Sequence, residues 1–197
     1  MRKVSIFFLL TLFASAFWWT ACKKTAQRQK VSTDSLHQQL QVMNDSVANA
    51  WQEMIADDDE KHAFMKRLLL EVAYTGNFDS AEYKAYMQKI KTLQDMRYTQ
   101  LGLVDSDGID RYDSATLTLT RQLTEYAEGH PEYEKFGLMK ELVEDINAKN
   151  GMILLQRVHY DGFVKDRNAF IEANRDLLDP KNARYGLKKL PIFELPS

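Results

Sequence analysis

The 197-residue sequence holds one cysteine, four prolines and eight glycines, and these shortages exclude several kinds of fold. A single thiol cannot form an internal disulfide, so disulfides do not hold the fold together. Few prolines and glycines argue against the turn-rich texture of a β-sandwich or β-barrel. The 26 basic residues do not outnumber the 28 acidic ones, so a nucleic-acid partner is not expected.

Sequence motifs for catalysis and cofactor binding are also missing. The four histidines are widely spaced, and no pair has the spacing of a zinc site. The sequence has no phosphate-binding loop, dinucleotide-binding fingerprint or nucleophile elbow. We therefore expect no enzymatic activity, no metal and no cofactor.

The first 22 residues carry the clearest signal in the sequence. Arg2 and Lys3 precede an apolar run over 4–19, and Thr20-Ala21-Cys22 follows it. This order is typical of an export signal over residues 1–21. The segment is similar to a bacterial lipobox, although Trp19 stands where leucine is usual. Lipidation of Cys22 would anchor the chain to the membrane and explain an otherwise exposed thiol.

An uncleaved transmembrane helix is the alternative, because Val4–Ala21 is just long enough to span the hydrocarbon core. The basic residues on its two sides balance, so they do not decide its orientation. Both alternatives attach the chain to a membrane. We expect a bacterial cell-envelope protein that faces the periplasm or the outside, with residues 22–35 as a flexible tether.

Apolar residues at steps of three and four predict four helices. The first lacks glycine and proline from Thr33 to Thr75 and ends at Gly76. Asp79 caps the second. The third ends at Gly129, and the fourth runs from Pro131 to about Leu178.

This pattern predicts an all-α fold over residues 36–179. It is an elongated, antiparallel, up-down four-helix bundle with two long and two shorter helices. Residues 36–50 and 161–177 would pair largely alone as a stalk, and Gly162 would allow close contact between helices. The tail, 180–197, would pack back on the bundle through Leu190, Ile192 and Phe193, or touch the membrane through its basic residues.

Four charged residues fall on the apolar stripes and predict a polar layer inside the bundle. Counting from the turns places Arg97 and Arg157 near the level of Asp57 and Asp58. A buried charge is costly unless it is paired. The layer is either a salt bridge that sets helix register, which we favour, or a site for an ion or small ligand.

Two other groups of residues have a structural and a functional interpretation. The aspartates of segment 105–110 suggest calcium, but the spacing of an EF-hand fails, so we expect a solvated turn. Several tyrosines would line either a distal peptide groove or, as we favour, ordinary core. They are Tyr83, Tyr86, Tyr112, Tyr126 and Tyr133.

Four segments and the tail resemble the LemA family. The segments are 44–54, with its Ala50-Trp51 pair, 130–136, 142–150 and 157–168, and Pro191-Ile-Phe193-Glu resembles the aromatic end of the family. Asp161 and Arg167 depart from the family's Asn and Tyr. The resemblance implies a membrane-anchored four-helix bundle and implies no activity.

The function that we expect is that of a non-enzymatic envelope adaptor or spacer, which meets a protein partner at its distal tip. The alternative is a sensor or ligand-binding bundle that uses the polar layer around Arg97 and Arg157.

Overall fold

The computed structural model describes residues 33–179 and 187–193, and this part of the chain is all-helical, as predicted. Its elements are α2 (Thr33–Tyr74), α3 (Ser80–Met96), the 3₁₀ helix η1 (Leu101–Val104), α4 (Ser106–Glu128) and α5 (Gly137–Leu178). The expected signal peptide, Cys22 and most of the tether lie outside the described residues. None of the described helices is long and apolar enough to cross a membrane.

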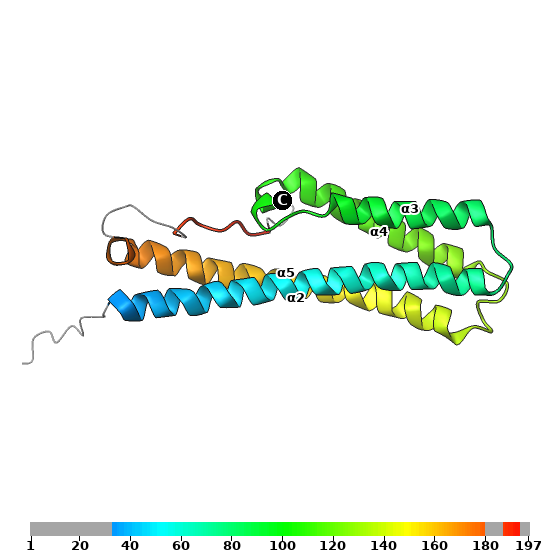
Figure 1. Ribbon diagram of the computed structural model, residues 1–197, viewed down its shortest axis with the longest axis horizontal. Helices are drawn as coiled ribbons and strands as arrows, with labels where there is room; N and C mark the ends of the chain where they lie inside the picture. The colour runs from blue at the N-terminus through cyan, green and yellow to red at the C-terminus, as the bar shows by residue number, and fades with distance from the viewer. Residues whose placement is uncertain (1–32, 180–186, 194–197) are drawn as a thin grey trace, which may run out of the picture.

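The two longest helices, α2 and α5, have 42 residues each and lie side by side along the molecule (Figure 1). The start of α2 contacts the end of α5, because Leu36 and Leu40 share a buried cluster with Ile171 and Leu178. The shorter α3 and α4, with 17 and 23 residues, cover the other half of this pair. The turns after α2 and α4 therefore lie together at the far end, which we call the tip.

Local sequence signals explain the first helix boundaries. Gly76 follows α2 with a φ of 74°, a left-handed conformation that glycine adopts without strain. Asp79 caps α3, because its carboxylate accepts hydrogen bonds from the backbone N–H groups of Ala81 at 2.6 Å and Glu82 at 3.0 Å. Both signals stand where the sequence predicted them.

The structure corrects three local predictions. Segment 105–110 is not a solvated turn, since Asp105 caps α4 and accepts a hydrogen bond from Gly108 N at 3.0 Å. Helix α5 begins at Gly137 rather than at Pro131, because 131–135 forms turns. Gly162 does not mediate close helix contact. It is exposed, and a Cβ there would meet no atom within 4 Å.

Apolar side chains form three clusters along the described bundle. The cluster between the tip and the middle joins α2, α3, α4 and α5, and the predicted tyrosines 83, 86, 126 and 133 pack against it, partly buried. The middle cluster joins α2 and α5 to η1 and the start of α4. The third holds only α2, α5 and Leu187. Among the described residues, the pair of long helices is therefore least covered at the end where α2 begins.

The tail packs back along α5 (Figure 1). Asn168 donates a hydrogen bond to Leu190 O at 2.9 Å and accepts one from Leu190 N at 3.0 Å. Phe193 N donates to Asp161 Oδ1 at 2.9 Å, and the Phe193 ring is buried in the middle cluster. Described residues 187–193 thus cover the bundle, whereas the basic residues Lys181 and Arg184 lie outside the described part.

Candidate functional site

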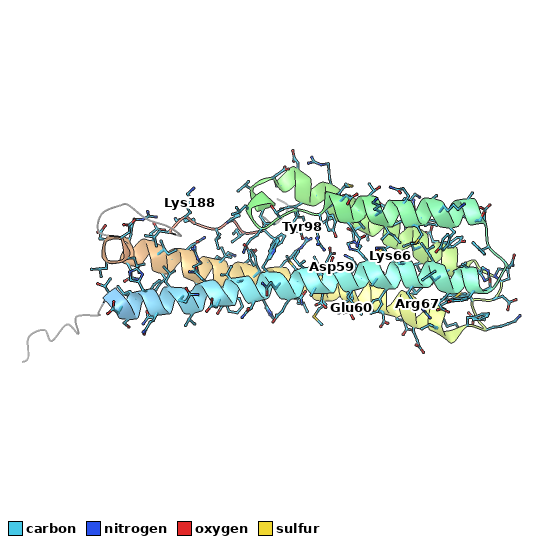
Figure 2. The ribbon with its side chains drawn as sticks, in the orientation of Figure 1. Asp59, Glu60, Lys66, Arg67, Tyr98 and Lys188 are labelled. Atoms are coloured by element: carbon cyan, nitrogen blue, oxygen red, sulfur yellow. The ribbon has the colours of Figure 1, made fainter. Side chains whose placement is uncertain are left out.

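Two of the four residues predicted for the polar layer meet directly. Arg97, at the end of α3, places its Nη1 atom 3.3 Å from Asp58 Oδ2 and 2.5 Å from Asp59 Oδ1. Both carboxylates are on α2, and Figure 2 shows Asp59 at the middle of the molecule's length. The arginine therefore ties the end of α3 to the centre of α2.

Asp58 is the buried centre of this group. It also binds Lys61, whose Nζ lies 2.8 Å from Asp58 Oδ1, and Tyr112, whose hydroxyl donates to Oδ2 at 2.5 Å. Burial alone would raise the pKa of Asp58, but Lys61 and the Tyr112 hydrogen bond outweigh it and hold that pKa below its usual value. The carboxylate is consequently charged and shared by two cations and a phenol.

His62 lies next to this carboxylate and is fully buried. Its Nε2 is 3.5 Å from the Tyr112 hydroxyl and its Nδ1 is 3.9 Å from Asp58 Oδ2. Burial lowers the pKa of His62 to about 4, and the nearby Lys61 adds to the effect although Asp58 opposes it. The imidazole is therefore neutral at physiological pH.

Arg157 does not join Asp57 or Asp58, which corrects the predicted pairing. Its two terminal nitrogens donate to the two carboxylate oxygens of Asp113 on α4, each at 2.6 Å, and Nη2 also donates to Tyr98 at 2.7 Å. Burial disfavours the charged guanidinium, yet the Asp113 hydrogen bonds outweigh it and raise the pKa of Arg157. The prediction considered only the level of each residue along the bundle. The rotation of α4 about its own axis places Asp113 next to Arg157 of α5.

Asp57 lies on another side of α2 and forms a separate contact with α5. Lys149 binds both Asp57 and Glu60, and Gln156 donates a hydrogen bond to Asp57. The four predicted residues therefore belong to three groups rather than to a single layer. The groups link neighbouring helices at about the same level, and together we call them the polar layer.

Aromatic rings close the layer on the side of the tail. Tyr98 packs against Tyr112, Phe193 and Trp51, with ring centroids 5.4, 5.6 and 6.2 Å apart. The Arg157 guanidinium lies over the Phe193 ring at 4.8 Å. Burial raises the pKa of Tyr98 to about 12, so its phenol stays protonated and donates or accepts hydrogen bonds as a neutral group.

A pocket of about 250 Å³ lies between α4 and α5, beside the polar layer. Its lining combines charged, polar and apolar side chains. They are Asp58, Lys61, Tyr112, Asp113, Thr116, Leu117, Asn150, Ile153, Leu154 and Arg157. Thr116 is 7 % exposed, and its hydroxyl has no hydrogen-bond partner among the described residues.

The tip holds a second candidate surface. His130 joins its two turns, because Nδ1 accepts from Glu132 N at 3.1 Å and Nε2 therefore donates to Asn77 O at 2.7 Å. A hollow of about 490 Å³ lies beside it, lined by Asn77, Phe78, Asp79, Glu125, Tyr126, Gly129, His130 and Pro131.

The tip surface, defined here as segments 74–84 and 125–136, is acidic and partly apolar. It carries six acids and two bases, and the lysine at 135 is paired with Glu132 at 2.9 Å. Tyr74 is 73 % exposed, and Phe78 and Phe136 are also exposed. Burial and the neighbouring Glu82 carboxylate raise the pKa of the Tyr126 phenol. Apolar contact and negative potential thus occur on the same surface.

Sequence reasoning missed Lys61, His62 and Asp113. A signal for the first two was present, since Asp58, Lys61 and His62 continue the helical stripe between Met54 and Met65. Among the described residues, no group of three or more histidines, cysteines and acids is placed to hold a metal ion. The layer can pair charges, fix helix register and offer hydrogen-bond donors to the pocket.

Comparison with known proteins identifies no relative. No family model, no curated protein and no solved structure matches the chain. The resemblance to the LemA family therefore stays a prediction.

Proposed function

We propose that this protein is a lipid-anchored, non-enzymatic spacer of the bacterial cell envelope, a divergent member of the LemA family, which presents its tip surface to a partner protein. Anchoring through Cys22 would place the membrane a short tether before Thr33, where α2 begins. At about 1.5 Å per residue, the 42 residues of α2 reach about 63 Å. An antiparallel bundle of this length would hold the tip well away from the bilayer.

The single observation that best supports the proposal is the composition of the tip surface. Exposed large apolar side chains grouped on one surface mark interaction sites. Here Tyr74 and Phe78 lie among acids that outnumber bases three to one. Carboxylates would steer and select a partner of opposite charge. We infer that the partner contributes a basic segment with at least one apolar anchor.

The pairing of the central charges supports the spacer function in another way. Arg97 is paired with Asp58 and Asp59, and Arg157 with Asp113, so each cation already has a carboxylate partner. Such pairs fix which helix faces meet and hold each short helix in register with a long one, α3 with α2 and α4 with α5. The alternative, ligand binding at this level, is favoured by the pocket between α4 and α5.

Membrane attachment is tested first, with Cys22→Ser in the intact chain. The proposal expects lipid labelling of the wild type and loss of that label in Cys22→Ser. If Cys22→Ser remains in the membrane fraction and the wild type takes up no lipid label, the N-terminal segment is a transmembrane helix instead.

Partner docking is tested with a photo-crosslinking residue at Tyr74, and with the same residue at Val42 as a control. Both positions are well exposed, at 73 % and 65 %, but Val42 lies far from the tip on α2. We expect an adduct from position 74 alone, with a basic peptide at the crosslink. Charge reversal by Glu125→Lys and Glu128→Lys should abolish it. An adduct that survives both reversals, or that forms equally at 42, would contradict the proposal.

A further inference from the structure

The pocket between α4 and α5 has the composition of a ligand site. Ligand binding there would be a second function, separate from partner docking at the tip surface. Its inner wall is polar, with Lys61 and Thr116 both more than nine-tenths buried. Its outer wall is apolar, with Leu117 and Leu154 at the mouth, where their side chains are 70 % and 60 % exposed. Small-molecule sites combine mainly apolar walls with a few polar groups in the same way.

The polar lining of the pocket contains hydrogen-bonding groups that have no partner among the described residues. The Thr116 hydroxyl and Arg157 Nε are buried and have no partner among the described residues. Lys61 has Asp58 as its ion-pair partner and keeps further N–H donors. Leaving a buried polar group unpaired is unfavourable, so a ligand that offers oxygen acceptors would stabilise the site.

The charges around the pocket decide what kind of ligand fits. Asp58 and Asp59 balance Lys61 and Arg97, and the Asp113–Arg157 pair is neutral as a unit. A charged ligand group would enter this already balanced and partly buried site without a counter-charge, which is costly. The site therefore favours a ligand whose polar end is uncharged.

We propose that this pocket binds a small, uncharged, amphipathic molecule whose carbonyl or hydroxyl oxygen meets Thr116, Lys61 and Arg157. Its apolar body lies against Leu117, Ile153 and Leu154. Linear aliphatic amides have this chemistry, since the carbonyl accepts hydrogen bonds, the NH₂ group can donate to Asp113, and the alkyl chain covers the leucines at the mouth.

The test uses the full chain in lipid nanodiscs, with hexanamide as the probe and methyl NMR shifts of leucine, isoleucine and threonine as the readout. Empty nanodiscs correct for probe that partitions into lipid. We expect saturable shifts at Leu117, Ile153 and Leu154. Hexanoate and hexylammonium should bind at least about tenfold more weakly, because they carry a charge into a balanced site.

Two matched pairs of variants localise the binding. Thr116→Val should weaken hexanamide about fivefold, the size of one hydrogen bond, whereas Thr120→Val should not. Thr120 is on the same helix, is equally buried and also has an unpartnered hydroxyl, but does not line the pocket. Leu154→Glu should abolish binding, and Leu155→Glu should not, although their exposed fractions are 60 % and 61 %.

Three results would overturn the proposal. Shifts that are absent or do not saturate would mean that hexanamide has no specific site in the pocket. Tighter binding of hexanoate would show that the cations, not the neutral donors, define the site. Equal effects within either variant pair would place binding elsewhere. None of these results would affect the tip crosslink, so the docking function and the pocket are tested independently.

Discussion

The burial of His62 predicts that mild acid destabilises the bundle. The imidazole is fully buried among Asp58, Asp59, Lys61, Arg97 and Tyr112. Burial lowers its pKa from 6.5 to about 4 in the folded protein. Between about pH 4 and pH 6.5, the unfolded chain therefore binds a proton on His62 and the folded chain does not. The stabilising contribution is complete above pH 6.5 and is lost as the pH falls toward 4.

The magnitude follows from the two pKa values. At about 1.4 kcal/mol for each pH unit between them, the full window is worth about 3 kcal/mol, and about 2 kcal/mol is lost between pH 8 and pH 5. Asp58 adds little in this range, because its folded pKa lies below 3.8 and the group is ionised throughout. His62 thus dominates the change expected from the buried layer.

Urea unfolding of the full chain in non-ionic detergent, at pH 5 and at pH 8, measures the effect. The wild type should be about 2 kcal/mol less stable at pH 5. His62→Gln, which stays neutral at both values, should remove most of the difference. His159→Gln is the control, since His159 is exposed on α5. An equal loss of stability in wild type and His62→Gln would refute the reasoning.

Four further substitutions have expected effects on the free energy of unfolding, measured by the same assay at pH 8. Gly76→Ala should destabilise the fold by about 1 kcal/mol, because the backbone φ at this position is 74°. An unchanged free energy of unfolding would mean that the backbone at residue 76 is not left-handed. Gly162→Ala should stabilise by about 0.5–1 kcal/mol, since the position is helical, exposed and open, and destabilisation would reveal a hidden contact. Arg157→Met should cost about 1–3 kcal/mol, because it removes the bidentate hydrogen bond to Asp113. Unchanged unfolding cooperativity, helix content and stability would argue against a structural role for the polar layer. Phe193→Ala should cost about 3 kcal/mol if the buried ring holds the tail, and a cost below about 1 kcal/mol would show that the tail is not needed.

The ends of helices were predictable where a single residue type determines the local backbone conformation or capping. Gly76 and Asp79 are such positions, because left-handed φ and N-terminal capping are local requirements. The start of α4 was missed, although it also follows a capping aspartate. Asp105 stands among other aspartates and Gly108, and that composition is equally typical of a turn.

The candidate site was predictable only in part, because its contacts depend on helix rotation as well as level. Counting residues from the turns placed Arg97 near the level of Asp57 and Asp58, and Arg97 contacts Asp58. The same count gave the level of Arg157 but not its partner, since Asp113 is set by the rotation of α4 about its own axis. Counting residues along a helix gives the level of a side chain but not the rotation of the helix about its axis.

The central claim is that the chain stands on a membrane and holds its tip far from it. Energy transfer from a donor at residue 74 or at residue 42 to acceptor-labelled lipid headgroups tests this most directly. The two positions are on one helix, about 48 Å apart along its axis at about 1.5 Å per residue. We predict strong transfer from position 42 and weak transfer from position 74. Equal transfer from both positions would mean that the bundle lies along the membrane, and would contradict the claim.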